Sequence, residues 1–171
     1  SMEAVTRLRE AGATGFVRDI LQVQSHVEDV PVNEIVGFGS DPVGAGIDIE
    51  FLDYSPYEEL LFILGAGGIS DPSDWIAPTT NATPVLLADG GIVGIRSPRP
   101  GVDLPGRVVY LSFPLDAVPL GSGIGNNRAG LLKRALDFLA QPPNTSSITL
   151  DSDVYSLPGL AVVEVEDADL R

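Results

Sequence analysis

The sequence contains no cysteine and a single histidine, His26. The absence of cysteine excludes disulfide bonds, zinc sites built from thiolates and cysteine nucleophiles. One histidine is too few for a metal centre that uses several imidazoles. The chain also lacks an uninterrupted apolar run of about 20 residues, the length that a membrane-spanning helix needs. These absences remove several classes of enzyme and membrane protein before any motif is considered.

Basic residues are scarce as well, because 10 arginine and lysine residues stand against 24 aspartate and glutamate residues, a formal net charge of −14. Such a chain repels the phosphate backbone of nucleic acids, so we expect no nucleic-acid partner. A length of 171 residues suffices for one ordinary hydrophobic core and a small appendage. We therefore expect a main domain over residues 1–145 and a second unit over residues 146–171.

Residues 127–140 have the strongest helical pattern in the chain. Asn126 or Asn127 can cap the N-terminus of this helix with its side-chain oxygen. The helix is expected to end at the Gln-Pro-Pro-Asn sequence that follows it. Its expected apolar face consists of Leu131, Leu132, Ala135, Phe138 and Leu139.

Residues 3–24 are also expected to be helical, with Phe16, Ile20 and Val23 on one stripe. Beyond them the pattern changes to alternating or continuous apolar runs, which are typical of strands. Asp89-Gly90-Gly91 between two such runs is a strong hairpin signal. The expected strands are residues 33–37, 47–51, 58–64, 84–88, 91–95 and 107–113, followed in the C-terminal unit by residues 147–150 and 160–165.

A family resemblance is carried by segments that occur in this order: GFVRDILQVQ, VNEIVGFGSDPVGAGIDIEFL, APTTNATPVLLADGGIVGIR, and RVVYLSFPLDAV with the later NRAGLLKRALDFL. Over residues 15–140 the chain resembles the C-terminal portion of class I glutamine-amidotransferase-like domains of large secreted bacterial proteins. The resemblance implies an α/β fold, a partial flavodoxin-like three-layer sandwich with an antiparallel hairpin and a C-terminal β extension.

The chain departs from the active members of this family at their catalytic residues. An active amidotransferase uses a cysteine nucleophile with a histidine and a glutamate. The chain has no cysteine, and it reads Ser112-Phe113-Pro114-Leu115 where the active families read Phe-His-Pro-Glu. The resemblance therefore implies a non-catalytic domain. The tail ITLDSDVYSLPGLAVVEVEDADLR is similar to the opening of β-sandwich repeats in extracellular bacterial proteins, which implies a secreted or cell-surface location.

Carboxylates gather near the C-terminus and form the best metal candidate in the sequence. Calcium needs six to eight oxygen ligands, which converging carboxylates and carbonyls can supply. The spacing typical of an EF-hand is absent, and a solvated acidic edge that discourages strand pairing explains the same residues. We expect no other cofactor. The candidate calcium ligands are Asp151, Asp153, Asp167 and Asp169, with Glu164 and Glu166 nearby.

The remaining candidates have structural explanations that we favour. Ser25-His26 precedes Glu28 and Asp29, but neighbouring side chains rarely face each other productively, so a surface or capping histidine is expected. Gly121–Gly125 precedes a helix N-terminus and could bind an anion, although a flexible loop is the favoured interpretation. Other carboxylates and aromatic side chains could form a glycosidase pair or a binding platform: Asp41, Asp48, Glu50, Asp53, Phe51, Tyr54, Tyr57 and Trp75.

These observations predict a non-catalytic structural or protein-interaction module of a larger secreted or cell-surface bacterial protein. Its partners would be other domains of that protein, with self-association through the C-terminal strands as a further option. A first alternative is a hydrolase whose site includes His26, Asp41 or Ser112 beside the glycine-rich loops 37–46 and 121–125. A second alternative is an adhesion segment stabilised by calcium.

Overall fold

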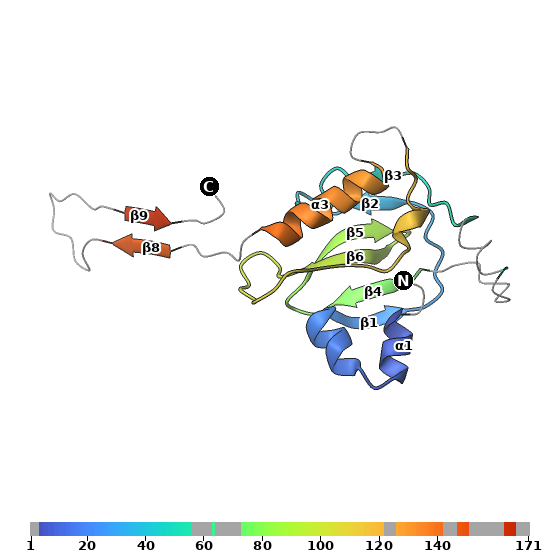
Figure 1. Ribbon diagram of the computed structural model, residues 1–171, viewed down its shortest axis with the longest axis horizontal. Helices are drawn as coiled ribbons and strands as arrows, with labels where there is room; N and C mark the ends of the chain where they lie inside the picture. Colours follow the sequence, from blue (N-terminus) through green and yellow to red (C-terminus); the bar gives the residue numbers. More distant parts are fainter. Residues whose placement is uncertain are drawn as a thin grey trace.

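The computed structural model describes residues 4–55, 63, 73–121 and 126–141, and the backbone of residues 147–150 and 163–166. These residues form short helices and small β-sheets (Figure 1). The elements in chain order are α1 (Ala4–Glu10), the π-helical turn η1 (Phe16–Ile20), β1 (Val23–Val27), β2 (Ile35–Gly37), β3 (Asp48–Ile49), β4 (Trp75–Pro78), β5 (Thr83–Ala88), β6 (Gly91–Ser97), β7 (Val108–Leu111), the 3-10 turn η2 (Leu115–Ala117), α3 (Arg128–Ala140), β8 (Ser147–Leu150) and β9 (Val163–Glu166).

Every strand pair in the described part of the chain is antiparallel. The main sheet has five strands in the order β3-β2-β5-β6-β7, and β1 pairs with β4 in a separate sheet. A flavodoxin-like sheet is parallel instead, and each parallel pair needs a crossover of a dozen or more residues, usually a helix. The expected flavodoxin-like sandwich is therefore wrong, and so is the resemblance to amidotransferase-like domains that implied it.

The connections between strands explain why the sheet is antiparallel. Only Asp89 and Gly90 join β5 to β6, and both have positive φ angles, 48° and 92°. Two such residues form the tight turn that matches the twist of a hairpin, so the expected hairpin is confirmed. Residues 98–107 join β6 to β7 and contain no helix. Neither connection has the length or the helix that a parallel crossover requires.

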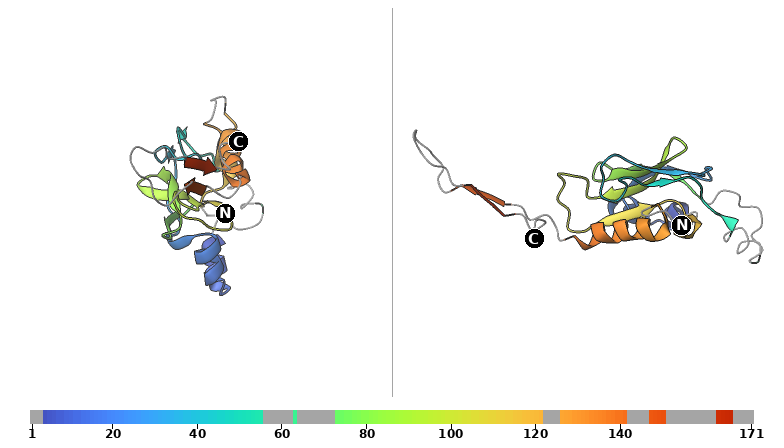
Figure 2. Two further views of the ribbon diagram at one scale, coloured as in Figure 1. Left: turned by 90° about the vertical axis from the view of Figure 1, so that its left-hand side faces the viewer. Right: turned by 90° about the horizontal axis from the view of Figure 1, so that it is seen from above.

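The main sheet is buried on both faces, each against its own apolar cluster. Along β7 the residues alternate, because Val109 and Leu111 pack on the first cluster whereas Val108 and Tyr110 pack on the second. The first cluster includes Leu131 and Phe138 of α3 and buried side chains of β2, β3 and β5. The second includes residues of α1, η1, β1 and β4. Figure 2 shows α3 lying along one face of the strands.

Helix α3 confirms the helix expected over residues 127–140. Asn127 caps it, because its side-chain oxygen accepts a 2.8 Å hydrogen bond from the backbone N–H of Gly130. The expected apolar face is only partly confirmed. Leu131, Ala135 and Phe138 are buried against the sheet, whereas Leu132 and Leu139 are 43% and 40% exposed.

The N-terminal segment is less helical than expected. α1 and η1 lie within residues 3–24, but Val23 begins a strand, and Phe16 and Ile20 are exposed rather than buried with it. β1 and β4 have no counterpart among the expected strands. Only Val23 of β1 and Ile76 of β4 are fully buried, so neither strand has the alternation by which a strand is recognised.

The tail strands form a third pair, in which β8 and β9 run antiparallel and pair with no other described strand. This confirms the strand expected at residues 147–150 and places its partner at Val163–Glu166 rather than 160–165. The strand expected at residues 58–64 falls almost wholly outside the described residues. The domain boundary near residue 145 stays a prediction.

Candidate anion-binding groove

Three adjoining cavities surround the loop of residues 98–107. Their volumes are about 560, 220 and 210 Å³, and Arg107 lines all three. The two smaller cavities also share Pro98 and Gln141, while the largest and the second share residues 104–107. The shared lining makes the cavities one branched groove, which we call the 98–107 groove. A large concave site with a few converging polar groups is the usual form of a ligand site.

The loop that frames this groove is held by backbone contacts and proline residues. The Arg99 N–H donates a 2.8 Å hydrogen bond to the Asn81 carbonyl, and the Val102 N–H donates to the Arg99 carbonyl at 3.1 Å. Proline at positions 98, 100 and 105 fixes the backbone φ angle at three points of the loop. The loop therefore presents its side chains from a restrained backbone.

Arg96 lines the groove and is held in place by several contacts. Its Nε donates a 2.6 Å hydrogen bond to Asp41 Oδ2, and both side chains are less than 10% exposed. A second bond of 2.6 Å runs from Nη1 to the carbonyl of Pro98. The guanidinium carbon also lies 4.9 Å from the centre of the Phe138 ring. These contacts hold the Arg96 guanidinium in one orientation, as a charge buried in a pair requires.

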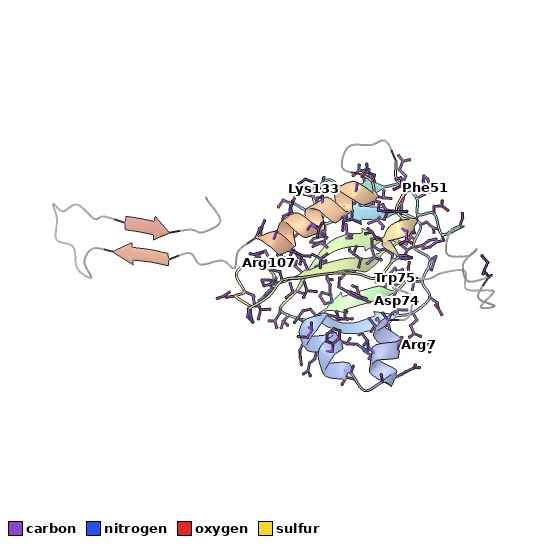
Figure 3. All side chains as sticks on the ribbon, in the orientation of Figure 1. Arg7, Phe51, Asp74, Trp75, Arg107 and Lys133 are labelled. Carbon is purple, nitrogen blue, oxygen red and sulfur yellow. The ribbon has the colours of Figure 1, made fainter. Side chains whose placement is uncertain are left out.

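Arg107 and Arg99 complete a positively charged lining. The Arg107 guanidinium carbon lies 4.9 Å from the centre of the Phe138 ring, and its Nη1 donates to Gln141 Oε1 at 3.2 Å. Figure 3 places Arg107 beside the C-terminal end of α3. Arg99 is exposed, and in the described ranges its guanidinium has no hydrogen-bond or ion-pair partner. The 210 Å³ cavity is thus lined by three arginine residues and no acidic residue.

The largest cavity has a different, mainly neutral polar lining of glutamine, threonine, asparagine and serine side chains. Arg18 and Asp19 at its edge form a two-point ion pair with distances of 2.8 and 3.1 Å. The hydrogen bond from Arg18 lowers the pKa of the exposed Asp19 carboxyl. Gln22 has a positive φ of 63° and hydrogen-bonds Thr79 through both backbone and side chain. These bonds join η1 to the start of the β4–β5 turn.

His26 was a candidate base, and the structure brings it to Thr6 and Glu28. Thr6 Oγ1 lies 2.8 Å from His26 Nε2, and Glu28 Oε1 lies 3.3 Å from the same nitrogen. Nδ1 is buried and has no partner among the described residues. A catalytic relay needs the carboxylate on one ring nitrogen and the nucleophile on the other, so this cluster lacks that geometry. A surface or capping histidine was expected, whereas the side chain is only 10% exposed and lies in strand β1.

The other residues of the predicted hydrolase site have structural roles. The Ser112 hydroxyl is buried and donates to the carbonyl of Asp74, with the carbonyl oxygen of Val93 3.2 Å away. Burial raises the pKa of the Asp74 carboxyl, an effect that His26 partly opposes. The 37–46 loop is a close-packing element, because a Cβ on Gly44 would lie only 2.1 Å from the Val85 carbonyl oxygen. None of the three cavities described above is lined by His26.

Of the predicted aromatic platform, Tyr57 lies outside the described residues, and the three described members do not gather at one site. The Tyr54 hydroxyl donates a 2.9 Å hydrogen bond to the carbonyl of Val32, and Trp75 packs against Gly91 and the first apolar cluster. Phe51 is exposed and lies apart from Trp75 (Figure 3). Among the scattered carboxylates, Asp53 accepts hydrogen bonds from the backbone and hydroxyl of Ser55, which lower its pKa. Tyr54, Trp75 and Asp53 thus make local structural contacts.

The predicted calcium ligands Asp151, Asp153, Asp167 and Asp169 lie outside the described residues, and so do residues 122–125 of the glycine-rich loop. Within the described ranges no group of three or more histidine, aspartate or glutamate residues is placed to hold a metal ion. No helix in those ranges is long and apolar enough to cross a membrane.

The arginine residues of the groove were missed by sequence reasoning. Three of them, Arg96, Arg99 and Arg107, fall within twelve positions of a chain whose charge is strongly negative. This density in an acidic chain is the signal that could have identified the groove. Which cavity they share depends on how residues 98–107 fold against α3. Among known proteins, no family model, no curated protein and no solved structure matches this chain.

Proposed function

We propose that the protein is a non-catalytic binding module whose ligand is a carboxylate next to an apolar group. The C-terminal residue of a polypeptide that ends in an aliphatic side chain has this chemistry. The observation that supports the proposal best is the 210 Å³ cavity lined by Arg96, Arg99 and Arg107 without an acidic residue, in a chain of net charge −14.

The arginine arrangement favours a planar anion of small size. A guanidinium presents parallel N–H donors that match the two oxygens of a carboxylate. Arg96 is held by Asp41 and Phe138, so its guanidinium lines the cavity in one orientation while its charge is balanced by Asp41. Arg99 at the rim keeps its donors available to a ligand, since no described residue engages its guanidinium.

The neighbouring 220 Å³ cavity favours an apolar group beside the anion. Its lining includes Val102, Leu104, Pro105 and Leu139, and it shares Pro98, Arg107 and Gln141 with the arginine cavity. A ligand could place its carboxylate among the arginine residues and an aliphatic side chain among these apolar residues. Burial of one such side chain contributes about 1.5–3 kcal/mol.

The negative net charge of the chain disfavours nonspecific binding of anions elsewhere on the protein. A protein of net charge −14 repels anions over most of its surface. An anion that binds must therefore be held by local donors, not by a general positive field. This argues for a ligand recognised by geometry as well as by charge.

The test is a calorimetric titration of the full chain with a short peptide that ends in leucine, compared with the same peptide as its carboxamide. We expect binding of the free acid and at least about tenfold weaker binding of the amide, because charge-assisted hydrogen bonds contribute about 1.5–3 kcal/mol. Arg99→Gln should weaken binding of the acid by about the same factor. Lys133→Gln is the matched control, because it removes one exposed positive charge far from Arg107 (Figure 3).

Three outcomes would contradict the proposal. The first is that the amide binds as tightly as the acid. The second is that Lys133→Gln weakens binding as much as Arg99→Gln does. The third is that inorganic phosphate binds as tightly as the peptide. A third peptide, amidated and with an internal Asp-Leu pair, separates a side-chain carboxylate from a chain terminus. The expected setting, a larger secreted or cell-surface protein, stays a prediction. An immunoblot of the native gene product in cell and medium fractions tests it.

A further inference from the structure

The outward face of α3 carries an exposed apolar stripe. Leu132, Leu136 and Leu139 lie four and three residues apart, which places them on one side of the helix. They are 43%, 54% and 40% exposed. We call these three residues the leucine stripe. Leu131 and Phe138 already hold the helix on the sheet from its inward face. The leucine stripe is therefore not needed for that packing, and a contiguous exposed apolar patch marks an interaction surface.

The β8–β9 hairpin follows α3 in the chain and has an apolar face of its own. Its register pairs Ile148 with Val165, and Leu150 with Val163. Residues directly opposite each other, and residues two apart on a strand, share one face of an antiparallel pair. The four apolar residues therefore occupy one face. The opposite face consists of Ser147, Thr149, Glu164 and Glu166.

A two-stranded hairpin alone is marginally stable in water, so a segment of this kind gains stability from a surface that covers its apolar face. No described strand other than its partner pairs with β8 or β9. The chain thus has two apolar surfaces of similar character, close in sequence, each without a described partner. We propose that the apolar face of the β8–β9 hairpin docks on the leucine stripe of the same chain.

The dimensions of the two surfaces agree. The leucine stripe is about 10 Å long at the helical rise of 1.5 Å per residue. A four-residue strand is about 13 Å long. In Figures 1 and 2 the hairpin lies beyond the C-terminal end of α3, so docking requires it to turn back along the helix. Residues 141–146 connect α3 to β8, and six residues span up to about 20 Å. This reach covers the whole stripe.

The short connection favours the hairpin of the same chain over that of a second copy. A short linker keeps its two ends at an effective concentration of about millimolar. A second copy would have to reach that concentration to compete. The docked hairpin would also border the apolar cavity next to Arg107, since Leu139 belongs to the stripe and to that cavity. The docking itself does not depend on the proposed carboxylate ligand.

The absence of cysteine permits a direct test by disulfide formation in the full chain. The double variant Leu136→Cys/Leu150→Cys places one thiol on the stripe and one on the apolar face of the hairpin. Leu136→Cys/Thr149→Cys is the matched control, with the second thiol one residue away on the opposite face. We expect the first pair to form an intrachain disulfide at least about tenfold faster, because the bond requires Cβ atoms about 4 Å apart. Mass spectrometry and gel mobility without reductant separate intrachain from interchain products.

If neither pair forms a disulfide, a second measurement tests whether the hairpin docks on α3. A spin label on the single variant Leu136→Cys should broaden the NMR signals of residues 147–166 in dilute protein. The proposal is overturned if the two thiol pairs oxidise at equal rates, or if linked dimers predominate. It is also overturned if neither pair is linked and the spin label leaves the signals of residues 147–166 unchanged.

Discussion

The inward and outward faces of α3 are built from similar side chains, yet the fold treats them differently. Leu131 is fully buried against the sheet, whereas its neighbour Leu132 is 43% exposed. Helix α3 has more apolar surface than the sheet can cover. The excess lies on the outward side, where it is free to bind another segment. Apolar character in a sequence therefore identifies surfaces that need a partner without saying whether the partner is the core.

The largest effect is expected from Leu131→Ala on the inward face. The side chain is fully buried in the first apolar cluster, so its truncation leaves a cavity and should reduce the free energy of unfolding by about 2–5 kcal/mol. Urea denaturation followed by circular dichroism measures the change. A loss of unfolding free energy below 1 kcal/mol would contradict the burial of Leu131 against the sheet.

The second effect concerns the ion pair that supports the inward face. Asp41→Asn removes the charge that neutralises buried Arg96, and unfolding free energy should fall by about 3 kcal/mol. Asp137→Asn is the control, because Asp137 pairs with Lys133 at the same 2.6 Å distance but on the exposed surface. Breaking that pair should cost less than about 1 kcal/mol. Equal losses in the two variants would contradict the role assigned to burial.

A smaller change in the free energy of unfolding is expected from Asp74→Asn. Asp74 is a buried residue, only 4% exposed. Burial raises its pKa above the ordinary 3.8, so the folded state favours the protonated form. The corresponding stability is present below the ordinary pKa and is lost as pH rises through the raised one. Asp74→Asn should therefore gain stability relative to the wild type as pH rises, by about 1 kcal/mol or less.

The measurement is a series of urea denaturation curves between acidic and neutral pH for the two proteins. Asparagine keeps an oxygen that can accept a backbone hydrogen bond, so the comparison isolates the charge. A difference between variant and wild type that stays constant with pH, or grows toward acid, would contradict the raised pKa.

The smallest effect is expected from Leu132→Ala on the outward face, the counterpart of Leu131→Ala. Because the side chain is exposed, the free energy of unfolding should change by only about 0.5 kcal/mol. The same denaturation curves measure it. A loss as large as that of Leu131→Ala would show that Leu132 is part of the core in solution.

Local patterns were sufficient to predict several elements. The cap at Asn127, the Asp89-Gly90 turn and the strands around β5, β6 and β7 depend on interactions between residues close in the chain, and the structure confirms them. The predicted fold class failed because it rested on a family resemblance and not on the strand connections. The short β5–β6 turn was visible in the sequence and already pointed to antiparallel pairing.

The candidate site could not be predicted in the same way. Arg96 and Arg107 are eleven positions apart, and both guanidinium carbons lie 4.9 Å from the centre of the Phe138 ring on α3. Asp41 was noted as a scattered carboxylate, and its pairing with Arg96 depends on a contact between residues 55 positions apart. Contacts of this range depend on packing, which no local pattern encodes.

The sequence by itself determined which chemistries are excluded, where the chain turns and where α3 begins, because composition and local backbone preferences control these properties. Only the tertiary structure decided which leucine residues of α3 are buried and which arginine residues share a cavity. Both outcomes depend on which surfaces meet when the sheet and helix pack. That is a property of the whole fold, since each packed surface excludes water from another that is distant in the chain.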